Sequence, residues 1–140
     1  MKPNQYNRAQ GSKGEQYIID LLKKRSITFE REKVFKDCYN GLYRYDFYLS
    51  ELNTLIEYNG EQHYTYTKKF YKSKSDFLKA QERDRRKISY ALARGIKIYC
   101  IPYWEIDNLS SPEDLFSQKF LAKSKFHNDD VFRIKKQYTK

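Results

Sequence analysis

A long helical period that ends at a glycine and leads directly into a short apolar run is the feature that most constrains the fold of this chain. Residues 73–94 keep the helical spacing of apolar side chains, Gly95 ends the period, and residues 96–101 form an apolar run that stops before Pro102. A helix followed at once by a strand is typical of a layered domain in which helices cover a sheet.

The segments before this helix supply another helix and three strands. Helical spacing, with a Ser-x-x-Glu capping pattern at its start, predicts a helix over residues 15–24. Alternation of apolar and polar residues predicts strands over residues 27–35, 43–49 and 55–59. The resulting order αβββαβ predicts an α/β (α+β layered) fold, with a mixed sheet flanked by helices.

Length and charge indicate one domain and a polyanionic partner. The chain has 140 residues, which divide into a flexible basic arm over 1–13, a domain over 14–125 with a short helical segment over 111–123, and a basic C-terminal tail over 126–140. It carries 28 Lys and Arg against 18 Asp and Glu, a formal net charge of +10. Such an excess attracts polyanions, so DNA or another nucleic acid is the first partner to consider.

Membrane segments, disulfides and zinc sites are not expected. No apolar run approaches the roughly 18 residues that a membrane span needs, and residues 1–16 lack the apolar core of a signal peptide. We therefore expect a soluble, cytoplasmic protein. Cys38 and Cys100 lie far apart without a CxxC pattern, which predicts two reduced cysteines. No organic cofactor is expected.

Two acidic residues fall on faces that the helical period places inside the protein. Glu15 shares the apolar face of the first predicted helix, and Asp84 lies at the centre of the apolar stripe of the second. The stripe consists of Phe77, Ala80, Ile88 and Ala91. A buried carboxylate needs a hydrogen bond or a cation, so Asp84 is a candidate site residue. The alternative is a helix rotated outward or an ion pair with a neighbouring arginine, namely Arg83, Arg85 or Arg86.

Two of the predicted strands can form a hairpin that places two carboxylates opposite each other. A turn centred between Glu51 and Leu52 puts Asp46 opposite Glu57 on one face of the sheet. Facing carboxylates destabilise a sheet unless a cation lies between them, and oxygen ligands suit Mg²⁺ or Mn²⁺. The alternative is a solvated face on which Arg44 neutralises the pair.

The turn after the last of these strands carries a histidine close to the carboxylates. Asn59 shares the face of the pair, and His63 follows in the segment Gly-Glu-Gln-His-Tyr. A histidine at this position could reach water at a bound ion, with Asp84 orienting its ring. His127, in the polar tail, has no such context.

In this order the residues resemble the PD-(D/E)xK nuclease superfamily, in which an Asp on one strand is followed by (Asp/Glu)-x-Lys on the next. Asp46 matches the first position and Glu57-Tyr58-Asn59 the second, with Asn59 in place of the lysine. The branch that the chain resembles contains very-short-patch repair endonucleases and phage homing endonucleases and has an E-D-x-H-D pattern. That pattern corresponds here to Glu15, Asp46, the segment around Tyr58 and Asn59, His63 and Asp84.

The resemblance implies a restriction-endonuclease-like core and a metal-dependent DNA endonuclease of the homing or repair type, which hydrolyses phosphodiester bonds. The implied ligands of Mg²⁺ or Mn²⁺ are Asp46, Glu57 and the main-chain carbonyl of Tyr58. The protein would be a monomer or homodimer, encoded by a phage or other mobile element and acting in a host cell.

The same resemblance implies a role for each remaining residue of the pattern. His63 would act as a base toward water or as a proton relay, and Asp84 would fix its tautomer. Glu15 would hold water beside the ion. Asn59 would orient water or the scissile phosphate without supplying charge, so the absence of lysine there weakens the match to the standard mechanism.

Lysines interleaved with aromatic residues after His63 indicate a surface for DNA, on which lysines contact phosphates and rings stack or wedge. The candidate DNA-binding residues are Lys68, Lys69, Lys72, Lys74, Lys79, Arg85 and Arg86. The alternative is a solvated lysine face over a few core aromatic residues.

Functions from different classes therefore stay open. The first is the DNA endonuclease. The second is a nuclease-derived DNA-binding or inhibitory module in which Asn59 has weakened turnover. A junction resolvase on the same fold is a third option.

Overall fold

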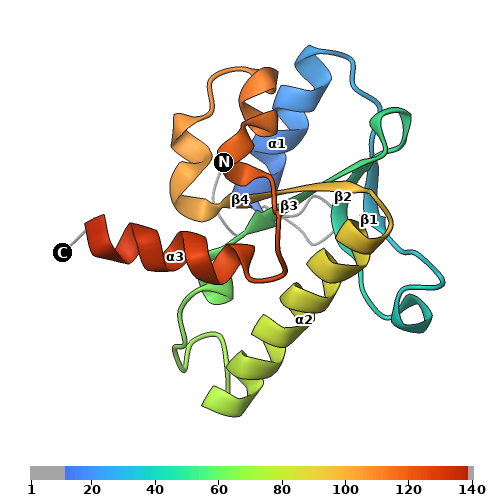
Figure 1. Ribbon diagram of the computed structural model, residues 1–140. Coiled ribbons are helices and arrows are strands. Elements are labelled where there is room, and N and C mark those ends of the chain that lie inside the picture. Colours follow the sequence, from blue (N-terminus) through green and yellow to red (C-terminus); the bar gives the residue numbers. More distant parts are fainter. Residues whose placement is uncertain (1–11, 139–140) are drawn as a thin grey trace.

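A four-stranded mixed sheet between helices organises the computed structural model, which describes residues 12–138 (Figure 1). The strands follow one another across the sheet in chain order, antiparallel in the first two pairings and parallel in the third. They are β1 (Glu30–Lys33), β2 (Tyr45–Leu49), β3 (Thr54–Asn59) and β4 (Lys97–Pro102). The predicted αβββαβ order and mixed sheet are confirmed.

Three α-helices and several single turns of 3₁₀-helix complete the fold. The α-helices are α1 (Lys13–Lys24), α2 (Lys74–Ala93) and α3 (His127–Tyr138). The 3₁₀ segments are Tyr39–Gly41, Ser50–Leu52, Glu61–His63, Tyr103–Asn108, Pro112–Phe116 and Gln118–Phe120. No helix in the described range 12–138 is long and apolar enough to cross a membrane.

The α2 helix connects the only parallel pair among the described strands. Parallel neighbours need a long crossover, and α2 supplies it between β3 and β4. Ser73 caps the helix by accepting a hydrogen bond from the N–H of Asp76 at 3.2 Å. Gly95 ends the segment with a φ of +70°, a conformation that glycine adopts without strain. The predicted boundaries of this unit are thus correct within a residue.

Each face of the sheet has its own apolar core. On one face, Ile18 and Leu22 of α1 pack with Phe47 and Ile56 of the sheet and with Leu115. The α1 helix starts with the predicted capping box, in which Ser12 accepts from the N–H of Glu15 and the Glu15 carboxylate accepts from the N–H of Ser12.

The second core lies between the sheet and α2. Ile88 and Ala91 of α2 pack there with Leu55 of β3 and Ile98 of β4. Cys38 and Cys100 are both buried and free, as the sequence predicts. Since β3 sends Leu55 to this face, the alternation of a strand places Glu57 and Asn59 on it as well, directly beneath α2.

Several segments differ from the sequence-based expectation. The strand predicted over 27–35 shortens to β1, in which Glu30, Arg31 and Lys33 pair with β2, while Glu32 between them has a positive φ of 52°. The helix predicted over 111–123 consists of 3₁₀ turns. The basic tail assigned to 126–140 forms α3, so the domain continues beyond its predicted end at residue 125. The predicted arm lies outside the described residues, apart from Ser12 and Lys13 at the start of α1.

Candidate active site

Two carboxylates face each other where β2 and β3 separate. The hairpin pairs Phe47 with Ile56 and Tyr48 with Leu55, which is the predicted register. The backbone pairing of β2 with β3 ends before Asp46 and Glu57. There the Asp46 carboxylate, and not a backbone carbonyl of β2, accepts a hydrogen bond from the N–H of Tyr58 at 2.8 Å. The N–H and C=O of a strand residue point to the same neighbouring strand, so the Tyr58 carbonyl is also directed toward this side.

The environment of the pair disfavours charge on it. Glu57 is only 7% exposed. Burial and the charge of neighbouring Glu57 raise the pKa of Asp46 well above the usual value of an aspartate. Two buried carboxylates in one place contribute nothing to fold stability by themselves, and strongly perturbed acids of this kind are typical of functional sites.

Lys87 of α2 supplies the cation for this pair. Its Nζ lies 2.7 Å from Glu57 Oε1 and donates to the main-chain carbonyl of Arg44 at 2.6 Å. The side chain is 12% exposed. Burial lowers the pKa of Lys87, but the charges of Glu57 and Asp46 outweigh that effect and raise it. The interpretation in which the Arg44 side chain neutralises the pair is therefore wrong, because Lys87 does so.

His63 and Asp84 form the predicted second pair beside the carboxylates. His63 Nδ1 lies 2.7 Å from Asp84 Oδ2, and the Asp84 side chain is 13% exposed. Burial raises the pKa of Asp84, but the hydrogen bond with His63 and the charges of His63 and Arg83 outweigh it, so the net shift is downward. When Nδ1–H is donated to Asp84, Nε2 is left as a proton acceptor. Arg83 Nε is 3.7 Å from the other Asp84 oxygen, so the expected arginine ion pair is also present.

Glu15 lies at the edge of this site. Its side chain is 20% exposed and its Oε1 forms an ion pair with Arg31 Nη2 at 2.7 Å. Burial and the negative charge of Asp46 raise the pKa of Glu15. The first turn of α1 therefore brings a third carboxylate into the electrostatic neighbourhood of the pair.

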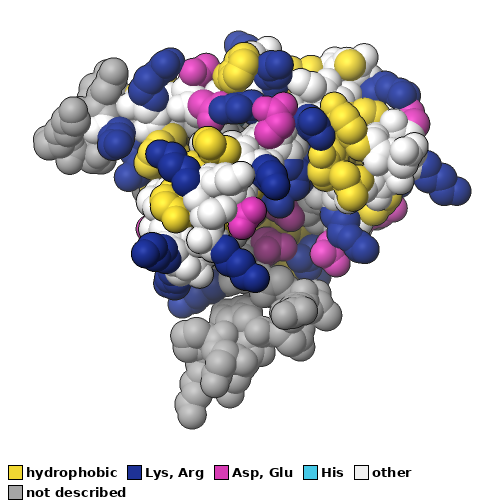
Figure 2. Space-filling view, turned by 90° about the horizontal axis from the view of Figure 1, so that it is seen from below, with side chains coloured by type: hydrophobic (Ala, Val, Ile, Leu, Met, Phe, Trp, Pro, Cys, Tyr) yellow, Lys and Arg dark blue, Asp and Glu magenta, His cyan; other side chains and the backbone are white. Residues whose placement is uncertain are grey.

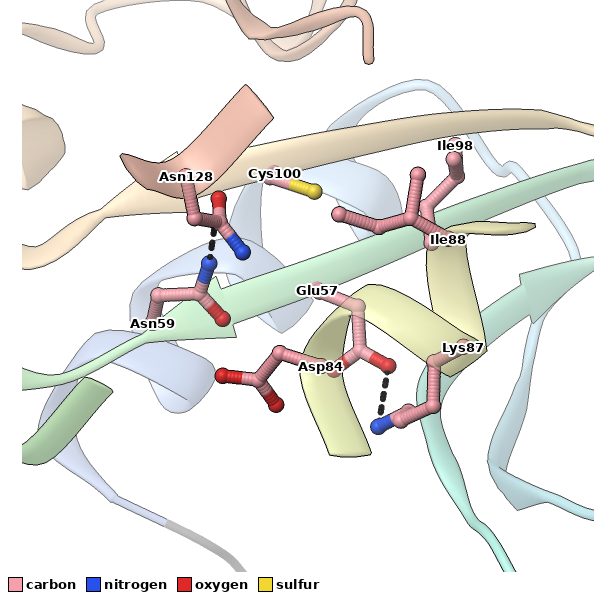
Figure 3. Close-up of a pocket in the computed structure, with 8 residues that line it drawn as sticks. All are labelled: Glu57, Asn59, Asp84, Lys87, Ile88, Ile98, Cys100 and Asn128. Carbon is pink, nitrogen blue, oxygen red and sulfur yellow. Dashed lines mark hydrogen bonds and ion pairs between the residues drawn. The ribbon is translucent and has the colours of Figure 1, made fainter. Parts of the chain in front are cut away.

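Asn59, at the end of β3, is turned toward the C-terminal helix. It is 2% exposed, and its Nδ2 donates to Oδ1 of Asn128 at 3.1 Å. Figure 3 shows Glu57, Asn59, Asp84 and Lys87 between β3 and α2, with Asn128 reaching in from α3. The structure thus brings the predicted residues of β3 and α2 together in one pocket.

The α3 helix is held over this end of the sheet by contacts along its length (Figure 1). Asp129 Oδ2 accepts from Arg85 Nε at 3.0 Å. The Phe132 ring stacks on Tyr64, with centroids 5.4 Å apart and planes at 24°. Lys135 places its Nζ 5.0 Å from the centre of the Trp104 ring. These contacts make α3 a wall of the site.

The predicted DNA-binding residues fall into two groups. Arg85 bridges Glu82 and Asp129, and Arg86 interacts with Glu82 and Tyr43. The lysines are all exposed, and in the part of the chain that the structure describes they form no ion pair; they are Lys68, Lys69, Lys72, Lys74 and Lys79. Figure 2 shows Lys and Arg side chains surrounding a central group of Asp and Glu on the lower face of the molecule.

Sequence reasoning missed Lys87 and Asn128. Lys87 follows Asp84 by three residues and Ala80 by seven, which places it on the apolar stripe of α2. The helical period therefore indicated that Lys87 is buried. It was missed because Lys87 belongs to a run of basic residues, which is typical of a solvated surface. For Asn128 the sequence offered no comparable signal.

Few groups of the site could hold a hard divalent cation. Residues 12–138 contain no group of three or more His, Cys, Asp or Glu side chains arranged to hold a metal. Asp46, Glu57 and the Tyr58 carbonyl would provide an oxygen-only set with few protein ligands, which suits Mg²⁺ because this ion usually keeps several waters. The two carboxylates share the single ammonium of Lys87, and burial beside Glu57 raises the pKa of Asp46, so a second negative charge at this place calls for a further cation.

Comparison with known proteins assigns no family. No family model matches the chain, and no solved structure matches it. The protein named Uncharacterized protein 094L of Frog virus 3 (isolate Goorha) is 42% identical to it over 59 residues. That alignment covers 41% of the chain and 38% of the viral protein, so the chain matches well under half the length of this relative.

We expect opposite stability effects from removing the cation and from removing one carboxylate. Lys87→Met should lower the free energy of unfolding by roughly 3–5 kcal/mol, because it leaves buried charge unpaired. Asp46→Asn should raise it by roughly 0.5–2 kcal/mol, since Asn still accepts the Tyr58 N–H while the repulsion with Glu57 is removed. Thermal or urea unfolding at pH 7 measures both. Lys79→Met, at an exposed position of α2, is the control and should change stability by no more than roughly 0.5 kcal/mol.

The effect of Asp46→Asn has a defined pH dependence. The folded-state pKa of Asp46 is raised, so the folded protein binds this proton more tightly and the wild type loses stability as the pH rises from the unfolded-state pKa through the folded-state pKa. The advantage of the variant therefore grows with pH over that interval. An Asp46→Asn protein less stable than wild type at pH 7 would contradict this electrostatic description.

Proposed function

We propose that the protein is a metal-dependent DNA endonuclease, a hydrolase of phosphodiester bonds. The observation that carries the proposal is the carboxylate pair of Asp46 and Glu57, which shares one ammonium and lies next to the His63–Asp84 pair. Such a concentration of buried charge is unfavourable for folding, so a role in chemistry is the better explanation for it.

The residues have separate tasks under this proposal. Asp46, Glu57 and the Tyr58 carbonyl would hold Mg²⁺ or Mn²⁺, which when bound neutralises charge on the phosphate and makes water a better nucleophile. His63 Nε2 takes a proton from water, since Nδ1 is committed to Asp84. Glu15 holds water on the side of α1.

Lys87 performs the charge function that the lysine of a (D/E)xK motif would have. Asn59 occupies that motif position and carries no charge. Lys87 reaches the same carboxylate, Glu57, from α2 at 2.7 Å. It places a positive charge against the carboxylate that is proposed to bind the cation.

DNA is the proposed substrate because the chain as a whole is basic. The formal net charge is +10, and exposed lysines follow His63 along the chain. Lysines of this kind bind phosphates without reading sequence, and they make affinity fall steeply with salt. The partial similarity to a protein of Frog virus 3 agrees with an origin in a virus or other mobile element, and action in a host cell, in repair or homing, is part of the proposal.

One observation favours the alternative of a catalytically weakened DNA-binding or inhibitory module. The Asn59 amide nitrogen, at the position of the motif lysine, donates to Asn128 of α3. A protein in which this contact has replaced catalysis would bind DNA with and without metal and would leave it intact.

Cleavage assays with the purified protein test the proposal. Supercoiled, linear and branched DNA are incubated with the protein in Mg²⁺, in Mn²⁺ or in EDTA, and the branched substrate tests for a junction resolvase. We expect cleavage that requires the cation and is abolished by Asp46→Asn, while DNA affinity stays within a few fold because the lysine surface is unchanged. Full activity of Asp46→Asn would refute the site, and intact DNA under all conditions would favour the binding module.

The His63–Asp84 pair should behave as one unit in single-turnover kinetics. His63→Ala and Asp84→Asn should each lower the cleavage rate by roughly 10² or more. The double variant should be little slower than either single variant, since Asp84 has no ring to orient once His63 is gone.

Stability measurements separate this role from a structural one. The lowered pKa of Asp84 means that its contribution to stability is present above its unfolded-state pKa and is lost as the pH falls through the folded-state pKa. Asp84→Asn should therefore lower the melting temperature at pH 7 and not at strongly acidic pH. A variant that melts lower at pH 7 but cuts at the normal rate would show that Asp84 only stabilises the fold.

A further inference from the structure

We propose that a pocket between α2 and α3, beside His63, binds a single unstacked nucleotide of the DNA adjacent to the bond that is cut. The inference rests on the proposed endonuclease function and names the substrate feature that the site would select. We call this cavity the α2–α3 pocket; besides His63 and Asp129 it is lined by Tyr64, Gln81, Asn128, Phe132, Arg133 and Lys136.

The position of the α2–α3 pocket links it to the candidate active site. His63 lines the pocket and also pairs with Asp84. Asn128 lines it and also bonds to Asn59 at the end of β3. A nucleotide bound here would therefore lie directly beside the groups that are proposed to act on the phosphodiester.

Aromatic rings form one wall of the pocket. Phe132 stacks on Tyr64, and Trp104 lies behind both rings at centroid distances of 6.0 Å and 4.8 Å. Rings supported in this way are a rigid surface for the π-face of a base. Stacking of a base on an aromatic side chain contributes about 1–3 kcal/mol and tolerates any base.

Amide groups on the opposite helices can read the edge of the base. Among the described residues, the Gln81 amide of α2 forms no hydrogen bond, so both its oxygen and its nitrogen are available. The Asn128 oxygen accepts from Asn59, which leaves the Asn128 NH₂ group as a donor. Amides that offer donors and acceptors together suit the mixed edge of a nucleobase.

The charge at the pocket suits the backbone on either side of that base. Asp129 is the acid that lines the pocket, and Arg85 neutralises it at 3.0 Å. Arg133 and Lys136 are exposed at the rim, where Arg133 also pairs with Asp130 at 2.9 Å. Cations at the rim of a pocket can contact the phosphates while the base occupies the interior.

The size of the pocket limits it to one nucleotide. Its volume is about 230 Å³, which is below the usual range of pockets for drug-sized ligands and too confined for a base pair. A base can enter only after it leaves the duplex stack, which is least costly at a bulge, mismatch or other unpaired position. The preferred substrate is therefore DNA with an unpaired nucleotide near the cleavage point.

Binding of matched bulged duplexes tests the inference. One duplex carries a single bulged adenine, a second carries an abasic bulge at the same place, and a third is fully paired. Affinities are measured by fluorescence anisotropy in EDTA, so that no cleavage occurs. We expect the bulged adenine to bind about tenfold more tightly than the abasic bulge, corresponding to a base-stacking contribution within the usual range.

Substitutions in the α2–α3 pocket test whether this pocket causes the preference for the adenine bulge. Phe132→Leu and Gln81→Ala should reduce the ratio between the two bulges to about one and leave affinity for paired DNA within twofold. Gln81 lies on α2 and makes no hydrogen bond, so Gln81→Ala cannot detach α3. Ile134→Ala is the control, because Ile134 lies on α3 and lines a different groove with Pro102 and Phe120.

The outcomes separate this inference from the proposed function. Equal binding of the adenine and abasic bulges, or a preference that survives both variants, would overturn the nucleotide pocket even if the protein cuts DNA in Mg²⁺. A preference for the adenine bulge that Gln81→Ala removes would support the pocket even if no DNA is cut, and the absence of cutting would then count against the endonuclease alone.

Discussion

The ion pair between Lys87 and Glu57 is the interaction on which the rest of the site depends. Lys87 attaches α2 to the sheet at two strands, because its Nζ contacts Glu57 of β3 and the carbonyl of Arg44 just before β2, while its own main-chain carbonyl accepts from Tyr45. The same contact keeps the Asp46 carboxylate beside a neutralised neighbour. Without it, two acids would be buried without compensation.

A single ammonium, that of Lys87, is paired with the two carboxylates, and three irregular features of the fold surround them. A ladder that ends early, a strand end bonded to α3 and a histidine turned to a buried aspartate all surround the same carboxylates. Each of these features weakens regular secondary structure or buries a polar group. Proteins retain such features mainly where chemistry or binding requires them.

Much of this arrangement followed from periodicity. The hairpin register could be predicted because a short turn and the alternation of β2 and β3 agree on one pairing, which puts Asp46 opposite Glu57. Asp84 could be found because a carboxylate at the centre of an apolar stripe has to meet a partner, and that partner is His63. The positions of these residues could be predicted because they depend only on the periodicity of one or two elements.

The features that could not be predicted depend largely on contacts between segments that are far apart in the sequence. Residues 127–138 are polar and carry few apolar side chains, so their helix is stabilised by contacts with Tyr64, Arg85 and Trp104 that no local pattern reveals. The β1 strand is shorter than its sequence predicts, and Glu32 within it has a positive φ that sequence preferences do not indicate. The function itself stays a proposal, since neither fold nor periodicity specifies a reaction.

Calorimetric titration of the protein with Mn²⁺ at several pH values tests the central claim most directly. If Asp46 and Glu57 form a cation site, the wild type binds Mn²⁺, its affinity increases with pH because the ion displaces the proton favoured by the raised pKa of Asp46, and Asp46→Asn removes the binding. Lys79→Met should bind like the wild type. Mn²⁺ binding that Asp46→Asn leaves unchanged, or no binding by the wild type at any pH, would contradict the claim.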